Sequence, residues 1–173
     1  MENILQAMIA NWPVWLVSVV LVVAAIIDGK ILKVPNWLTF PFILCGWMHG
    51  TIHGGLAGLG FILLGTAVGM ALLLVLRAVG GMGAGDVKLL GGVGAWLGAS
   101  TTWWAFLATA IVGGVMAVVM IATSGKWQHH LAMAKQILNE WVTIRDPEKL
   151  AAIARERKPS MRLLPYGIPM AIG

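Results

Sequence analysis

The sequence predicts an all-α fold, a polytopic bundle of helices embedded in a membrane. Of the 173 residues, 59% are hydrophobic and 11% are charged, and the mean hydropathy is +0.86. An ordinary soluble domain has about 25% charged and roughly 45–50% apolar residues, so this chain has too little polar surface for a soluble globule. No charged residue occurs between Lys33 and Arg77 or between Lys88 and Lys126. Uncharged stretches of this length are typical of bilayer-spanning helices.

Four apolar runs give the clearest candidate spans. A helix needs about 20 apolar residues to cross the hydrocarbon core of a bilayer. The first run is slightly short of that length, and the second contains a proline that a membrane helix can tolerate. These runs are Trp12–Ile27, Trp37–Ile52, Leu56–Leu76 and Trp103–Thr123.

Two further segments are less clear, and the first of them contains the run Trp103–Thr123. The uncharged stretch Leu89–Gly125 has room for two spans with a turn near Gly98–Thr102, although its first half is short enough to leave a re-entrant or tilted segment open. The segment Leu163–Gly173 is too brief to cross a bilayer alone, so the last span is partial or cut short in this chain. We therefore expect five or six membrane helices within a single membrane-embedded domain over residues 1–173.

The positions of the basic residues predict the orientation of the bundle. All twelve Lys and Arg residues lie in three links, over residues 28–36, 77–88 and 126–162. The links on the opposite side, around His49–Gly55 and Gly98–Thr102, contain none. The positive-inside rule then places the three charged links in the cytoplasm, as in a multi-pass protein of the inner membrane. This distribution argues against a nucleic-acid partner despite the net charge of +5.

The cytoplasmic loop over residues 126–162 has a pattern of its own. Asp146, Pro147 and Glu148 are typical of a helix start, and a short cationic helix is expected from there to Lys158. Before it, apolar residues recur near helical spacing among polar ones, which predicts an amphipathic helix at the membrane surface. They are Trp127, Leu131, Leu138, Trp141 and Ile144. A solvated loop and a surface that docks substrate are both open.

Two acidic residues, Asp28 and Asp86, lie beside predicted spans on the cytoplasmic side. Ionisable groups at the edge of a span are costly and often functional, although either carboxylate could simply reach water among the lipid head groups. A carboxylate at a helix C-terminus also opposes the helix dipole, so ordinary stability does not explain Asp28. Two carboxylates can hydrolyse a peptide without a metal when one activates water and the other donates a proton.

Glycines cluster around Asp86. Gly80, Gly81, Gly83 and Gly85 precede it within six residues. Glycine lets backbones approach closely, so these residues would leave room for an extended peptide beside the carboxylate. Close packing of membrane helices is the other explanation, and it is the one expected for the glycines within the spans. These are Gly58, Gly65, Gly69, Gly94 and Gly98.

Two motifs contain these aspartates. Asp28 is followed by Val34-Pro35-Asn36-Trp37-Leu38-Thr39, and Asp86 lies in Gly83-Ala84-Gly85-Asp86-Val87-Lys88. With the closing Pro165-Tyr166-Gly167, they resemble the prepilin peptidase family of GxGD intramembrane aspartyl proteases, from about Ala24 to the end of the chain. The resemblance implies about six membrane helices, a catalytic pair at Asp28 and Asp86, and cleavage of a prepilin leader after glycine at the cytoplasmic face.

The resemblance also carries expectations about the rest of the site and its partners. It assigns substrate positioning to Gly83, Gly85, Lys88, Pro35 and Asn36. The implied partners are the lipid bilayer and a prepilin-like membrane precursor, either a bacterial pilin or an archaeal preflagellin. Bifunctional members carry an N-terminal methylating domain with paired Cys-x-x-Cys motifs, whereas this chain has one cysteine. We therefore expect the peptidase-only form found for Tad/Flp pili, with no cofactor and no metal.

Two other uses of these residues were weighed. His49 and His53 are spaced i, i+4 and could bind a metal, but the sequence shows no third ligand, and a position at the outer interface is favoured. A small polytopic transporter or channel could use Asp28 and Asp86 as ion sites. Such sites favour the bilayer midplane, whereas these aspartates lie at the edges of the predicted spans.

Overall fold

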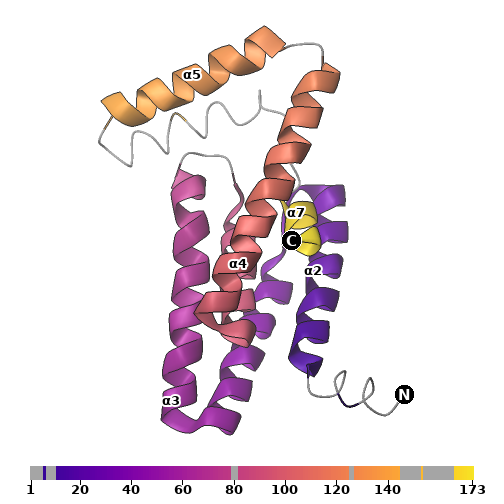
Figure 1. Cartoon of the computed structure of the whole chain (residues 1–173), viewed down its shortest axis with the longest axis vertical. Coiled ribbons are helices and arrows are strands. Elements are labelled where there is room, and N and C mark those ends of the chain that lie inside the picture. Colours follow the sequence, from indigo (N-terminus) through magenta and orange to yellow (C-terminus); the bar gives the residue numbers. More distant parts are fainter. Residues whose placement is uncertain (1–5, 7–10, 79–81, 125–126, 145–152, 154–165) are drawn as a thin grey trace.

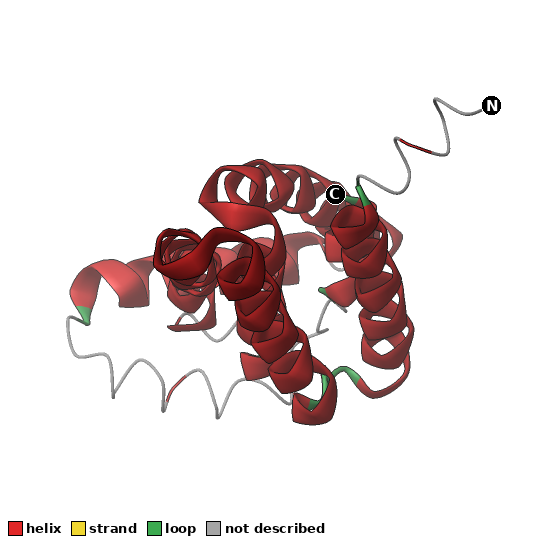
Figure 2. Cartoon of the chain, turned by 90° about the horizontal axis from the view of Figure 1, so that it is seen from below, coloured by secondary structure: helices red, strands yellow, loops and turns green. Residues whose placement is uncertain are grey.

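The computed structural model describes residues 6, 11–78, 82–124, 127–144, 153 and 166–173. Helices account for all the regular structure in these residues, and Figure 2 shows no strand among them. The helices are α2 (Trp12–Ile31), α3 (Asn36–Ala78), α4 (Ala84–Ser124), α5 (Trp127–Thr143) and α7 (Gly167–Ile172). Three of them, α2, α3 and α4, are long and apolar enough to cross a membrane. The all-α prediction is confirmed, and the chain is an integral membrane protein.

Glycines divide both of the longest helices into two arms. A straight helix of 43 or 41 residues would measure about 60 Å, twice the roughly 30 Å of a bilayer core. Gly55 in α3 has φ 57° and ψ −145°, and Gly98 in α4 has φ 77° and ψ 172°. Glycine adopts such positive φ values at little cost. Each helix doubles back at its glycine, as Figure 1 shows for α3, within the turn regions expected from the sequence.

The first helix is longer than predicted. It begins at Trp12, as expected, but continues past Asp28 to Ile31, because Gly29 and Lys30 keep helical geometry. The helix ends at Leu32, which adopts the left-handed conformation with φ 51° and donates its N–H to the carbonyl of Asp28 at 2.8 Å. Asp28 therefore lies in the last turn of α2 rather than at its end.

The short first arm of α4 forms the centre of the bundle. This arm, residues 84–97, is about 21 Å long. Every residue from 89 to 95 is buried, whereas the second arm exposes large apolar side chains such as Trp104 and Ile111. This first arm corresponds to the segment for which a re-entrant or tilted arrangement is open from the sequence. In the structure the rest of the chain surrounds it. The number of helices that cross a membrane stays a prediction.

Glycines set the close approach between α3 and α4. A Cβ built on Gly65 would fall on the carbonyl of Gly94, and one built on Gly94 would fall on the carbonyl of Gly65. Gly69 makes the same kind of backbone contact with Leu90. Small residues let membrane helices pack backbone to backbone in this way. The helix-packing interpretation is confirmed for these three glycines.

The amphipathic segment forms α5, over Trp127–Thr143, at the end of the molecule opposite the hairpin turn of α3 (Figure 1). This agrees with the helix predicted in the first half of the loop. The second predicted helix, from Asp146 to Lys158, lies outside the described residues apart from Ile153.

Candidate active site

Asp28 is buried although it is ionisable. Only 3% of its surface is exposed, and its Oδ2 accepts a hydrogen bond from the backbone N–H of Gly167 at 2.8 Å. Gly167 is the first residue of α7, and α7 packs against both α2 and α4. The start of α7 therefore holds the Asp28 side chain in a fixed orientation.

Asp86 lies in the first turn of α4, as the sequence predicted, and it is 6% exposed. Its Oδ2 accepts the backbone N–H of Gly83 at 3.2 Å. The positive end of the helix dipole favours a carboxylate at this position. Two independent features of the backbone thus support a negative charge on Asp86.

The Tyr166–Gly167 turn interacts with Asp28 and lies within the electrostatic influence of Asp86. The backbone N–H of Gly167 donates to Asp28, while the negative charge of Asp86 acts on the phenol of the adjacent Tyr166. Tyr166 lies outside the three candidate spans, and its pKa is raised above the ordinary value of 10.0, first by burial and then by Asp86. Two carboxylates 58 positions apart in the sequence thus each act on this turn, Asp28 through a hydrogen bond and Asp86 through its charge.

The α2–α3 connection packs against the start of α4. A Cβ on Gly85 would fall on the backbone carbonyl of Val34, so the two backbones touch. One turn further along α4, Lys88 Nζ donates to Asn36 Oδ1 at 2.9 Å and lies 4.4 Å from the centroid of the Phe40 ring. These contacts fix the beginning of α3 beside the helix that carries Asp86.

The residues expected to position the substrate have roles inside the chain's own structure. Gly83 supplies the N–H that holds Asp86, and the space beside Gly85 is filled by Val34 rather than left open for a peptide. The carbonyl of Pro35 accepts the backbone N–H groups of Leu38 and Thr39 and starts α3. A direct contact of Asn36 or Lys88 with substrate stays a prediction.

Sequence reasoning did not include Tyr166 and Gly167 among the site residues. Both belong to the closing Pro-Tyr-Gly motif, which was used only to support the resemblance. The motif was the available signal, but nothing in the local sequence says that a turn 139 positions after Asp28 returns to it. That information comes only from the packing of α7 between α2 and α4.

The two histidines considered as metal ligands lie in an aromatic cluster at the other end of α2. The His49 ring stacks on Trp96 at 5.3 Å, meets Trp12 edge-on at 5.0 Å and lies 4.5 Å from His53, all between ring centroids. Within the described parts of the chain, no three His, Cys, Asp or Glu side chains gather as a metal site would require.

Comparison with known proteins identifies the family. The model of the type IV leader peptidase family matches residues 15–118, which include both aspartates and both turn glycines. The chain is 34% identical over 107 residues to a prepilin leader peptidase/N-methyltransferase of Neisseria gonorrhoeae, covering 58% of this chain and 37% of the relative. It is 32% identical over 124 residues to the protein of that name from Aeromonas hydrophila, covering 68% and 40%. No solved structure gives a significant match.

The fold thus agrees with a membrane-embedded peptidase, and this chain belongs to the type IV leader peptidase family. The chain spans about two fifths of the length of the curated relatives that it matches.

Proposed function

We propose that this protein is an aspartic endopeptidase that removes short basic leaders from prepilin-like membrane precursors at the cytoplasmic boundary of the inner membrane. One observation carries the proposal: two buried aspartates from distant helices both act on the Tyr166–Gly167 turn, Asp28 through a hydrogen bond and Asp86 through its charge, in a chain of this family. The names of the relatives, which pair prepilin leader peptidase with N-methyltransferase activity, support the substrate class. Methyl transfer is not part of the proposal.

The chemistry requires one ionised and one protonated carboxyl group. The ionised group takes a proton from water, which then attacks the scissile carbonyl, while the protonated group donates to that carbonyl or to the leaving nitrogen. Two neighbouring carboxylates sharing one proton can do both at near-neutral pH. Asp86 begins α4, where the helix dipole favours its charge, so we assign it the base role and Asp28 the acid role. The measured titration would belong to the pair.

The surface where α3 and α4 begin, called the rim here, supports a substrate-positioning role for Asn36 and Lys88. Asn36 is exposed, and its amide oxygen is engaged by Lys88 at the surface where α3 and α4 begin. An extended peptide crossing this rim could replace the Lys88–Asn36 bond with bonds from its own backbone. Asp28 and Asp86 would then lie below the peptide, where water and the scissile bond are partly shielded from solvent.

Replacement of either aspartate tests the catalytic pair. We expect Asp28→Asn and Asp86→Asn to abolish cleavage of a synthetic precursor with a basic leader and an apolar segment, because asparagine cannot exchange the proton. Sequencing the new N-terminus of the product made by wild type identifies the scissile bond. Both variants should remain in the membrane with wild-type thermal stability to within about 1–2 kcal/mol. Substantial cleavage by either variant would exclude the two-aspartate mechanism.

A further inference from the structure

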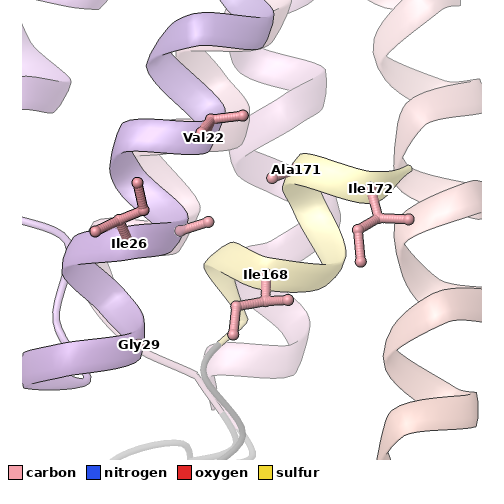
Figure 3. Close-up of a pocket in the computed structure, with 7 residues that line it drawn as sticks. Val22, Ile26, Gly29, Ile168, Ala171 and Ile172 are labelled. Carbon is pink, nitrogen blue, oxygen red and sulfur yellow. The ribbon is translucent and has the colours of Figure 1, made fainter.

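An apolar groove lies between α2 and α7, and one of its lining residues is Gly29, which follows Asp28 in the sequence (Figure 3). It has a volume of about 440 Å³. The α2 wall consists of Val22, Ala25, Ile26 and Gly29, which are spaced i, i+3, i+4 and i+7 and therefore form one face of the helix. The side chains of Ile168, Ala171 and Ile172 form the α7 wall.

Gly29 is not explained by the chain's own packing. It lies within helical geometry, where glycine is less favourable than alanine, and it has no positive φ. A Cβ at this position would meet only Ile168 Cδ1, at an ordinary contact distance of 3.8 Å. By contrast, Gly85 and Gly94 each face a backbone that leaves no room for a Cβ. The missing side chain at Gly29 keeps the groove open at the position that follows Asp28.

The lining restricts what the groove can hold. It offers only hydrocarbon side chains, so a peptide seated there must satisfy its own backbone hydrogen bonds and therefore be helical. Between helices in a bilayer, small residues favour close contact, and Ala25, Gly29 and Ala171 provide them. Val22 and Ile26 remain 50% and 55% exposed, so the described chain leaves this face open to a partner.

We propose that this groove binds the apolar helix that follows the scissile bond of the substrate, an inference that rests on the proposed function. Gly29 directly follows Asp28, and Val22 lies about 10 Å further along α2. A helix in the groove would therefore end level with Asp28 and continue into the site as extended chain. A second groove, of about 560 Å³ between α3 and α4, is lined by Val68, Leu76 and Phe106 among others and has neither aspartate as a neighbour in sequence.

A matched pair of bulky substitutions on α2 tests the groove. Val22 lines it, whereas Val23 is also exposed valine on the same helix but is not among the lining residues. Two synthetic substrates would share a leader and scissile region, one continuing into an apolar helix and one into a Gly/Ser segment. We expect Val22→Trp to lower kcat/KM for the apolar substrate by about tenfold or more, mainly through KM, and to leave the Gly/Ser substrate unchanged. Val23→Trp should behave as wild type on both.

Cross-linking identifies the occupant directly. In a Cys45→Ser background, Val22→Cys should form a disulfide with a cysteine in the substrate's apolar helix, and Val23→Cys should not. A Val22→Cys homodimer without substrate cross-links would instead make the groove an interface between two copies. Normal kinetics of Val22→Trp with no cross-link would show that lipid covers it. Either result overturns this inference and leaves the proposed function standing, whereas a wild-type protein that cleaves neither substrate overturns both.

Discussion

At the scale of single residues, the start of α7 does more for the site than its six residues suggest. Gly167 places a backbone N–H on Asp28 and must also be small, because a Cβ there would lie 3.0 Å from Asp28 Cβ and 3.2 Å from Ala25 Cα. The Tyr166 ring lies against α4 at Gly113, and the charge of Asp86 helps to raise the pKa of its phenol. The position of the Asp28 side chain therefore depends on a residue that carries no carboxylate.

Gly167→Ala should reduce activity without removing either aspartate. The added Cβ pushes α7 away from α2 and lengthens the N–H bond to Asp28. A hydrogen bond to a charged group contributes about 1.5–3 kcal/mol, so we expect kcat/KM to fall by roughly 10- to 100-fold. Gly114→Ala is the matched control, since a Cβ on Gly114 meets nothing within 4 Å. Equal activity of the two variants would contradict a positioning role for Gly167.

The titration of Tyr166 reports its position beside Asp86. Tyr166 is the only tyrosine in the sequence, so the ultraviolet absorption of the phenolate measures this residue alone. Burial and the charge of Asp86 raise its pKa above 10.0, which means that the neutral phenol persists in the folded protein and its stabilising contribution is lost only as pH rises through the raised value. We expect Asp86→Asn to lower the midpoint while burial keeps it above 10.0. An unchanged midpoint would place Asp86 too far from the phenol to matter.

At the scale of helices, the packing of α3 on α4 depends on a few backbone contacts. Gly94→Ala should destabilise the protein by about 1–3 kcal/mol, because its Cβ falls on the rigid carbonyl of Gly65. Gly60→Ala, also in a helix but with nothing within 4 Å, should be neutral or stabilising by up to about 1 kcal/mol. Thermal unfolding in detergent, followed by circular dichroism, distinguishes the two. Similar midpoints would mean that α3 and α4 can separate without cost.

The sequence was most informative where a local rule determines the helix. Hydropathy located the membrane helices and their turns, and Gly55 and Gly98 fall where uncharged links were expected. The predicted span ends four residues before α2 does, because a charge after an apolar run predicts the end of a span, whereas Gly29–Ile31 continue the helix. The packing of Gly85 against Val34 was not predictable locally, since the two residues lie 51 positions apart and only tertiary packing brings them together.

The site could be predicted only in part for the same reason. Both aspartates stand out locally as charges beside apolar runs, so composition and motif were enough to select them. The Gly167–Asp28 bond and the α2–α7 groove arise from contacts between opposite ends of the chain. Rules based on periodicity or propensity do not predict contacts between distant segments. The Pro165-Tyr166-Gly167 motif indicates only that this part of the chain belongs to the family pattern.

At the scale of the whole molecule, orientation in the membrane decides which side the aspartates face. The charged link after α2 contains exposed Lys33, and the uncharged turn inside α4 contains exposed Thr101. The positive-inside rule predicts that these two positions lie on opposite sides, with Lys33 in the cytoplasm. In a Cys45→Ser background, a membrane-impermeant thiol reagent should label Thr101→Cys in intact cells and Lys33→Cys only after permeabilisation.

The same experiment tests whether a leader can reach the site. A basic leader is held in the cytoplasm by the rule that orients this protein, so enzyme and substrate must agree in topology for the scissile bond to meet Asp28 and Asp86. Labelling of Lys33→Cys in intact cells would place both aspartates on the outer side, away from any retained leader. Labelling of Asp28→Cys from the outer side together with Thr101→Cys would instead indicate a water-filled path through the bundle, as in a transporter. The peptidase proposal requires that the reagent reach Thr101→Cys alone.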